Sequence, residues 1–169
     1  MPVQRLNHAV LFVRDVERSV AFYREALGFR AVMGMPGAVF LQASGSTNDH
    51  DLGLFEIGAQ AGPSGAGRST VGLYHLAWEV DTLQELERIA LKLSELNALV
   101  GASDHSTTKA LYAKDPDGLE FEVSWLVPAD LLTEEVLDGR SGIKPLDIAS
   151  EKERYGAETR GGLGVSIPV

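Results

Sequence analysis

Hydrophobic and polar positions follow the same order in two stretches of the chain. Residues 6–29 begin with an alternating segment, turn at Asp15 and continue with apolar side chains at helical spacing. Residues 73–96 repeat this order, with apolar side chains recurring every three or four positions from Leu83 to Leu93. Each stretch therefore predicts a strand, a turn and an amphipathic helix.

The two stretches correspond to one another at an offset of about 66 to 67 residues, since His8 aligns with His75 and Asp15 with Asp81. Short strand patterns follow each helix, and they cover residues 29–35, 38–44 and 52–58 in the first half and residues 99–103, 109–115 and 119–125 in the second. The sequence predicts an α+β fold in which two paired βαβββ modules form a curved mixed sheet around a cavity.

The repeat also sets the expected boundaries. One domain is expected over residues 1–127, with module one at about 5–58 and module two at about 72–127. The stretch between the modules is rich in glycine and has no periodicity, which favours a flexible connector. Residues 128–169 lie outside the repeat and form a C-terminal tail.

Within the tail, residues 128–139 and 146–156 have short helical patterns, each followed or closed by glycine. The last residues, 161–169, have the composition of an arm. We expect the tail to cover the cavity or to form a subunit contact.

Charge and composition exclude several classes of function. The chain has 169 residues and a net charge of −9, without a cluster of Lys and Arg, which argues against a nucleic-acid partner. The absence of cysteine leaves only imidazole and carboxylate ligands for a transition metal. Because no apolar leader or membrane-length segment is present, a cytoplasmic protein without a membrane partner is expected.

Side-chain alternation assigns the chemistry to one face of the sheet. In the last predicted strand one face carries Phe121, Val123 and Trp125, and the other carries Glu120, Glu122 and Ser124. The same test on residues 72–80 places Tyr74, Leu76 and Trp78 under the helix, and His75, Ala77 and Glu79 on the cavity side. On the first strand His8 shares a face with Val10 and Phe12. Two imidazoles and one carboxylate are thus predicted to point into one cavity.

Two histidines and one carboxylate form the facial triad that holds non-heme Fe(II) and leaves coordination positions open. A lone histidine on a strand is as readily a hydrogen-bonded structural residue. The recurrence of His8 and His75 at the same place in two repeats, with Glu122 on the matching face, strengthens the metal-site hypothesis.

These residues carry a family resemblance. The paired modules, the two histidines and the "DPDGLEFE" turn that ends at Glu122 resemble the vicinal oxygen chelate superfamily, which includes glyoxalases, bleomycin and fosfomycin resistance proteins and extradiol dioxygenases. The resemblance covers roughly residues 5–127. It implies a divalent metal in the bowl formed by the modules, held by His8, His75 and Glu122.

A second motif resembles the extradiol dioxygenase signature. In "HSTTKALYAKDPDGLEFE", His105 stands several residues before Tyr112, and a D-P-x-G turn leads to Glu122; Ser103 departs from the signature. The stretch "NDHDLGLF" resembles the segment that carries the acid–base histidine of these enzymes, which would be His50. The resemblance implies that His50 exchanges protons and stabilises reduced oxygen, while His105 and Tyr112 position the substrate oxygens and a proton. Taken singly, these three side chains are equally compatible with loop, turn and packing roles.

Two other functions stay open on the sequence. If the repeat places Glu56 opposite Glu122, then His8, Glu56, His75 and Glu122 resemble the four-ligand site of bacterial glyoxalase I, a metal-dependent lyase. That arrangement gives His50, His105 and Tyr112 no role. A binding protein that sequesters an antibiotic in the same bowl needs no catalytic histidine.

The sequence as a whole favours an extradiol, catechol 2,3-type dioxygenase of aromatic compound catabolism. Its cofactor is expected to be Fe(II), with Mn, Ni or Zn as alternatives, and its partners O2 and a small aromatic substrate. The cavity side offers apolar side chains at Val10, Phe12, Phe40 and Ala77. Assembly into a homo-oligomer stays open.

Overall fold

The computed structural model describes residues 2–3, 5–67 and 69–162 of the chain. It divides into two compact units, residues 1–64 with Asp115–Gly118, and residues 65–114 with 119–169. Each unit contains one βαβββ module, so the α+β fold with two modules is confirmed. Among the described residues, no helix has the length and apolar character needed to cross a membrane.

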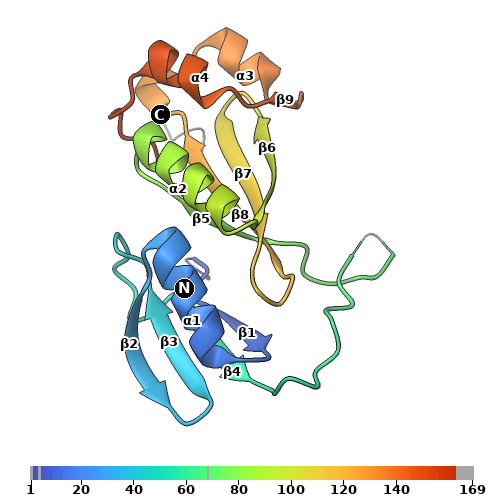
Figure 1. Ribbon diagram of the computed structural model, residues 1–169. Helices are drawn as coiled ribbons and strands as arrows, with labels where there is room; N and C mark the ends of the chain where they lie inside the picture. Colours follow the sequence, from blue (N-terminus) through green and yellow to red (C-terminus); the bar gives the residue numbers. More distant parts are fainter. Residues whose placement is uncertain (1, 4, 68, 163–169) are drawn as a thin grey trace. The chain divides into compact units, whose positions relative to one another are not determined.

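The first unit contains one helix on a four-stranded sheet, coloured blue to cyan in Figure 1. Its elements are β1 (Ala9–Val13), α1 (Val16–Leu27), β2 (Arg30–Met35), β3 (Ala38–Gln42) and β4 (Leu52–Glu56). The strand order is β1-β4-β3-β2, with β1 parallel to β4 and the other pairs antiparallel. Helix α1 begins at its N-cap Asp15, whose side chain accepts from the Arg18 N–H, and ends at Gly28 in the left-handed conformation.

Alternation along β1 sorts the two faces of this sheet as the sequence predicts. Leu11 and Val13 are buried with α1, whereas Val10 and Phe12 are 49% and 68% exposed on the opposite face. The turn Asp115–Gly118 belongs to this unit, where Tyr23 donates to Asp115 and Arg14 Nη1 lies 2.7 Å from Asp117 Oδ1.

The second unit repeats the plan and extends it. Its elements are β5 (Leu76–Glu79), α2 (Leu83–Glu95), β6 (Leu99–Asp104), β7 (Thr108–Lys114), β8 (Glu120–Leu126), a 3-10 turn (Ala129–Leu131), α3 (Glu134–Gly139), β9 (Lys144–Pro145) and α4 (Ile148–Tyr155). The strand order is β5-β8-β7-β6-β9, with β5 parallel to β8. The apolar positions of α2 that the periodicity predicts are buried: Leu83, Leu86, Ile89 and Leu93. Each such leucine contributes about 1.5–3 kcal/mol by burial.

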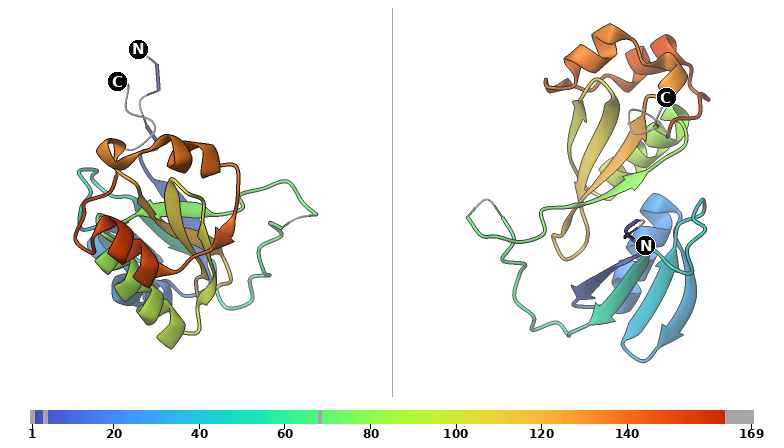
Figure 2. Two further views of the ribbon diagram at one scale, coloured as in Figure 1. Left: turned by 90° about the horizontal axis from the view of Figure 1, so that it is seen from above. Right: turned by 180° about the vertical axis from the view of Figure 1, so that it is seen from behind.

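The segment between the modules has no helix and no strand beyond one isolated bridge between Gly67 and Thr70, as far as it is described. In Figures 1 and 2 its described residues are drawn in green without a helix or strand. This agrees with the connector that the glycine-rich composition predicts.

The tail packs on the helix-bearing side of the second sheet. Lys152 of α4 forms an ion pair with Glu87 of α2, with Nζ and Oε2 2.6 Å apart. The ring of Tyr155 stacks on Trp125 at 5.5 Å, and Trp125 points away from the face that carries Glu122. Helix α4 therefore lies on the face opposite to the one that the sequence predicted the tail to cover.

Beyond α4 the chain crosses the ends of two strands. The Trp125 indole Nε1 donates to the Thr159 carbonyl, the Gly161 N–H donates to Asp81 and the Gly162 N–H to Leu126. A Cβ on Gly161 would lie 2.5 Å from Trp125 Nε1, so the backbone passes where no side chain fits. The rest of the predicted arm, 163–169, lies outside the described residues.

Candidate functional site

The polar face of the second unit brings together His75 and Glu122. Glu122 pairs with Ala77 across β5 and β8, which places its side chain on the face predicted by alternation. His75 stands one residue before β5, so the strand begins later than the sequence predicts. His75 Nε2 and Glu122 Oε2 are 3.4 Å apart, and both side chains are partly buried.

Tyr112 and His105 lie beside this pair. Tyr112 is the cross-strand partner of Glu122 in β7 and β8, and its hydroxyl lies 2.9 Å from Nε2 of His105. Burial, the charge of Glu122 with a hydrogen bond to it, and the charge of Tyr74 raise the pKa of Tyr112 to about 12. The phenol is therefore protonated at neutral pH and can donate a proton or a hydrogen bond.

Tyr74 also lies beside His75, where strand alternation did not place it. Alternation predicted that it packs under α2, but it is 64% exposed and its ring centroid lies 4.6 Å from that of His75. The reason is that β5 begins only at Leu76, so strand alternation does not extend to residue 74. The sequence signal that could have placed Tyr74 beside the candidate site is its position directly before His75.

The polar face of the first unit holds the other two histidines. The ring centroids of His8 and His50 lie 4.5 Å apart, and the ring of Phe40 meets His50 edge-on at 4.9 Å. Nδ1 of His8 lies 2.8 Å from Asn7 Oδ1, and Nδ1 of His50 lies 2.8 Å from Asp49 Oδ2. Since the His50 side chain is only 15% exposed, it is not an open loop residue.

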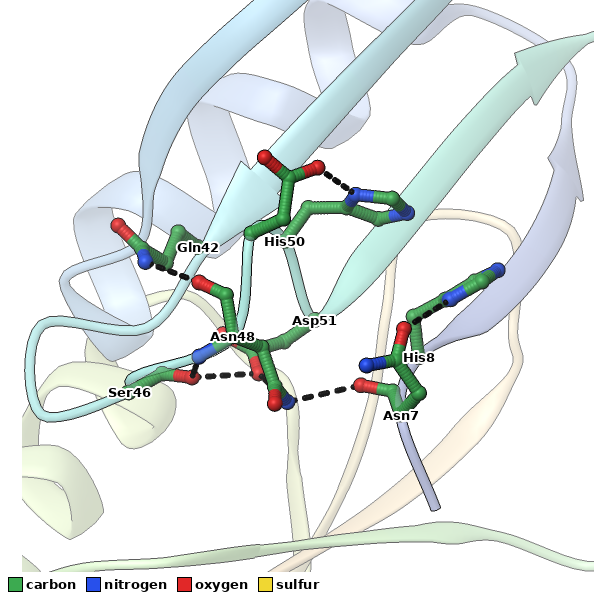
Figure 3. A network of polar contacts seen from close by, with 8 residues as sticks. Asn7, His8, Gln42, Ser46, Asn48, His50 and Asp51 are labelled. Atoms are coloured by element: carbon green, nitrogen blue, oxygen red, sulfur yellow. Dashed lines mark hydrogen bonds and ion pairs between the residues drawn. The ribbon is translucent and has the colours of Figure 1, made fainter.

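A hydrogen-bond network fixes the loop that carries His50 (Figure 3). Asp51 accepts from Ser46 Oγ, from Asn48 Nδ2 and from the Ala43 N–H. Asn48 Nδ2 also donates to the Asn7 carbonyl, which ties the loop to the residue before His8. The network thereby ties together Asn7 and Asp51, the residues next to the two histidines, at the start of β1 and β4.

The paired strands show which residue of the first module corresponds to Glu122. Glu122 pairs with Ala77, two residues after His75. Two residues after His8 stands Val10, and its partner in β4 is Gly53. The position equivalent to Glu122 is therefore occupied by a glycine, and a Cβ there would lie 3.3 Å from Val10 Cγ2.

Glu56 has a different task. It pairs with Val13, and its Oε2 accepts a 3.0 Å hydrogen bond from the Val16 N–H at the start of α1. A carboxylate at this position satisfies an unpaired helix N–H and interacts favourably with the helix dipole, which is typically worth about 1 kcal/mol. The alignment of Glu56 with Glu122, on which the four-ligand alternative depends, differs from the strand register.

The donor set of the second unit fits a divalent metal. Neighbouring ligands of an ion with bonds of about 2.1 Å are about 3 Å apart, close to the separation of His75 Nε2 and Glu122 Oε2. His75 Nδ1 is buried and makes no hydrogen bond to a described residue. Within the described part of either unit, no group of three His, Asp or Glu side chains forms a metal-sized cluster.

The family comparison agrees with this fold. Residues 5–123 match the Glyoxalase/Bleomycin resistance protein/Dioxygenase superfamily. The chain belongs to this superfamily. The match ends before the tail, so α3, β9 and α4 lie outside the superfamily domain.

Relatives within the superfamily have different activities. Catechol-2,3-dioxygenase of Bacillus subtilis is 32% identical over 118 residues, which cover 70% of this chain and 40% of that protein. The metallothiol transferase FosB of Lysinibacillus sphaericus is 28% identical over 129 residues, covering 72% of this chain and 82% of the relative. This chain therefore spans less than half of the dioxygenase and most of the transferase.

A solved structure shows the same fold. A variant of the fosfomycin resistance protein FosX of Listeria monocytogenes, complexed with Mn(II) and a dihydroxypropylphosphonic acid, has a TM-score of 0.55 at 18% identity. The match covers 72% of this chain and 90% of that one. Members of the superfamily thus bind divalent metals, and dioxygenases are among them.

Proposed function

We propose that this superfamily member is an extradiol ring-cleaving dioxygenase that uses one Fe(II) and O2 on a catechol-type aromatic substrate. His75 and Glu122 are two of the metal ligands, supported by their 3.4 Å separation on one polar face. His8 is the third, and its assignment rests on its position one residue before β1, as His75 stands one residue before β5.

The observation that carries the proposal is the difference between Glu122 and Gly53 at equivalent strand positions. A four-ligand site of the glyoxalase type needs a second carboxylate, whereas catechol cleavage needs coordination positions free for two substrate oxygens and O2. The first module offers no side chain at that position and uses Glu56 to cap α1. This favours the three-ligand arrangement.

The remaining polar side chains have defined tasks in this reaction. A bound divalent metal supplies Lewis acidity that helps a catechol lose a proton and brings O2 and substrate together. His50, held by Asp49 and packed against His8, accepts the proton from a catechol hydroxyl and later returns it. The Tyr112 phenol is protonated at neutral pH and donates a hydrogen bond to a substrate oxygen, while His105 orients the Tyr112 hydroxyl.

The test is metal reconstitution followed by oxygen uptake. Protein stripped of metal and reloaded anaerobically with Fe(II) should bind one equivalent, consume O2 with some member of a catechol panel and yield a coloured ring-opened product. Parallel samples loaded with Mn, Ni or Zn identify the active metal. Turnover of methylglyoxal with a thiol, and none of any catechol, would move the enzyme to the lyase class.

A fosfomycin-modifying enzyme is the second candidate. The observation in its favour is the similarity to the metallothiol transferase FosB, which is 28% identical over 129 residues. The same metal-loaded samples should therefore be incubated with fosfomycin and a thiol. Consumption of fosfomycin without oxygen uptake would replace the dioxygenase proposal.

A further inference from the structure

The turn between β6 and β7 carries His105 and is built from an uncommon backbone conformation. Ser106 has φ 68°, in the left-handed region that side chains other than glycine seldom adopt. The Asp104 carboxylate accepts from the Ser106 N–H at 2.7 Å, and the His105 N–H donates to the Thr108 carbonyl at 2.9 Å. Such a turn persists only where its surroundings hold it.

Helix α3 of the tail supplies the first set of contacts that hold this turn. Ser106 Oγ donates to the Val136 carbonyl at 2.7 Å. Gly139, the last residue of α3, lies so close that a Cβ there would be 2.7 Å from Ser106 Oγ and 3.1 Å from Ser106 Cβ. Figure 1 shows α3 at the end of the sheet where β6 and β7 join.

Strand β9 and helix α4 supply two further sets of contacts around this turn. Lys144 pairs with Asp104 at the edge of the sheet. Lys109, only 1% exposed, lies with Nζ 2.5 Å from Asp104 Oδ1 and 3.0 Å from Oε2 of Glu151 in α4. The contact with Glu151 is an ion pair without hydrogen-bond alignment. A buried ammonium requires such neutralisation.

We propose that the tail from α3 to α4 is a positioning device for His105. Through Val136, Gly139, Lys144 and Glu151 it holds the turn 104–108, and the turn holds the imidazole 2.9 Å from the Tyr112 hydroxyl. Every contact lies within the second unit and joins the superfamily domain to a segment outside it. The consequence for turnover rests on the proposed dioxygenase function, whereas the positioning itself does not.

The experiment uses the full chain, free of paramagnetic metal, with isotope-labelled histidine. The four histidines give four sets of imidazole NMR signals, assigned by single substitutions. Gly139→Ala forces a methyl against Ser106, and Glu151→Gln weakens the hold on Lys109. Lys152→Ala, which breaks the contact with α2, and the exposed Glu153→Gln are the controls.

We expect both test variants to move the His105 nitrogen shifts in the direction seen in Tyr112→Phe, where the hydrogen bond is deleted. The two controls should leave them in place even if they lower the melting temperature. In a Ser106→Gly background the effect of Gly139→Ala should disappear, because the side chain that transmits it is gone. Unmoved His105 signals in both test variants, or equal shifts in the controls, would reduce the tail to a general stabilising element.

Kinetics add a second readout. If the enzyme cleaves a catechol, Gly139→Ala should lower kcat by about tenfold or more, within the range for impaired proton transfer, and leave metal content unchanged. If the protein cleaves a catechol but the test variants leave the His105 signals unmoved, the positioning proposal alone is overturned. An NMR effect in a protein that cleaves no catechol would overturn the dioxygenase proposal alone.

Discussion

The two modules share one chain topology but differ in what their polar faces present. The first places His8 and His50 among apolar side chains such as Phe40 and has a glycine, Gly53, where the second has Glu122. The second gathers a carboxylate, two imidazoles and two phenols on its face. The two modules therefore share a topology and carry unequal donor groups.

The two modules also hold their histidines by different means. In the first, a loop network centred on Asp51 fixes His50 (Figure 3). In the second, strand pairing fixes Glu122 and Tyr112, and contacts from the tail hold the turn of His105. Among the candidate site residues, His105 therefore lies on a turn that contacts a segment beyond the superfamily domain.

The largest expected effect tests the unequal carboxylates. Glu122→Ala should lower metal affinity by more than about a hundredfold. Loss of a residue that only hydrogen-bonds to a metal ligand typically costs about 10- to 100-fold, and loss of a ligand itself should cost more. Glu56→Gln should retain one metal per chain and lose only a cap on α1, because its carboxylate bonds to the Val16 N–H. Metal content after dialysis measures both. A metal-depleted Glu56→Gln protein beside a metal-loaded Glu122→Ala protein would reverse the comparison.

The second effect concerns His50, the proposed acid–base residue in the first module. His50→Gln should slow turnover by about a hundredfold and leave metal content unchanged, since an acid–base group is lost while the ligands remain. Single-turnover oxygen uptake is the measurement. The matched variant Asn48→Ala removes hydrogen bonds of the loop but keeps the imidazole, so a milder loss is expected.

A third, smaller effect is expected from a substitution that makes the two modules alike. Gly53→Glu introduces a carboxylate at the position equivalent to Glu122 and should lower turnover by about tenfold or more, because it occupies space or coordination needed by substrate. Gly53→Ala should change the free energy of unfolding by less than about 1 kcal/mol. A strand alanine is favoured over glycine, but its Cβ would meet Val10 at 3.3 Å. Thermal melting and steady-state kinetics separate the two variants.

The smallest effect is the acid sensitivity of the second module. Burial acts to raise the pKa of Asp104, but hydrogen bonds from Lys109 and Ser106 and the charges of Lys109 and Lys144 lower it overall. Because the folded-state pKa is depressed, this stabilisation is present above about pH 4 and is lost as the pH falls through the folded-state value. Unfolding by urea between about pH 5 and pH 2 should lose stability less steeply in Asp104→Asn, whereas the exposed Asp138→Asn should follow the parent protein.

The sequence was sufficient for the features that depend on periodicity. Strand alternation separated Leu11 from Val10 and Val123 from Glu122, and helical spacing identified the buried face of α2. The resemblance further singled out His105 and Tyr112, which lie 2.9 Å apart in the structure, although their catalytic roles stay predictions.

Other features depend on register and long-range contacts, which a pattern does not contain. The offset of the repeat suggested that Glu56 corresponds to Glu122, but the parallel pairing of each module places Gly53 at the position equivalent to Glu122. Tyr74 was misplaced because alternation was extended beyond the start of β5. Helix α4 does not cover the polar face, the first of the two expectations for the tail, because it packs on the Trp125 side, where the buried Lys109 of β7 pairs with Glu151. A subunit contact stays a prediction.

The hydrogen bond between the Trp125 indole and the Thr159 carbonyl gives the protein an optical reporter. Trp125 is fully buried, and the chain has only one other tryptophan, the half-buried Trp78. Release of the tail would expose the Trp125 indole to water, shift its emission to longer wavelength and open it to quenching by acrylamide. In a Trp78→Phe background, the docking of the tail becomes measurable by fluorescence in dilute solution.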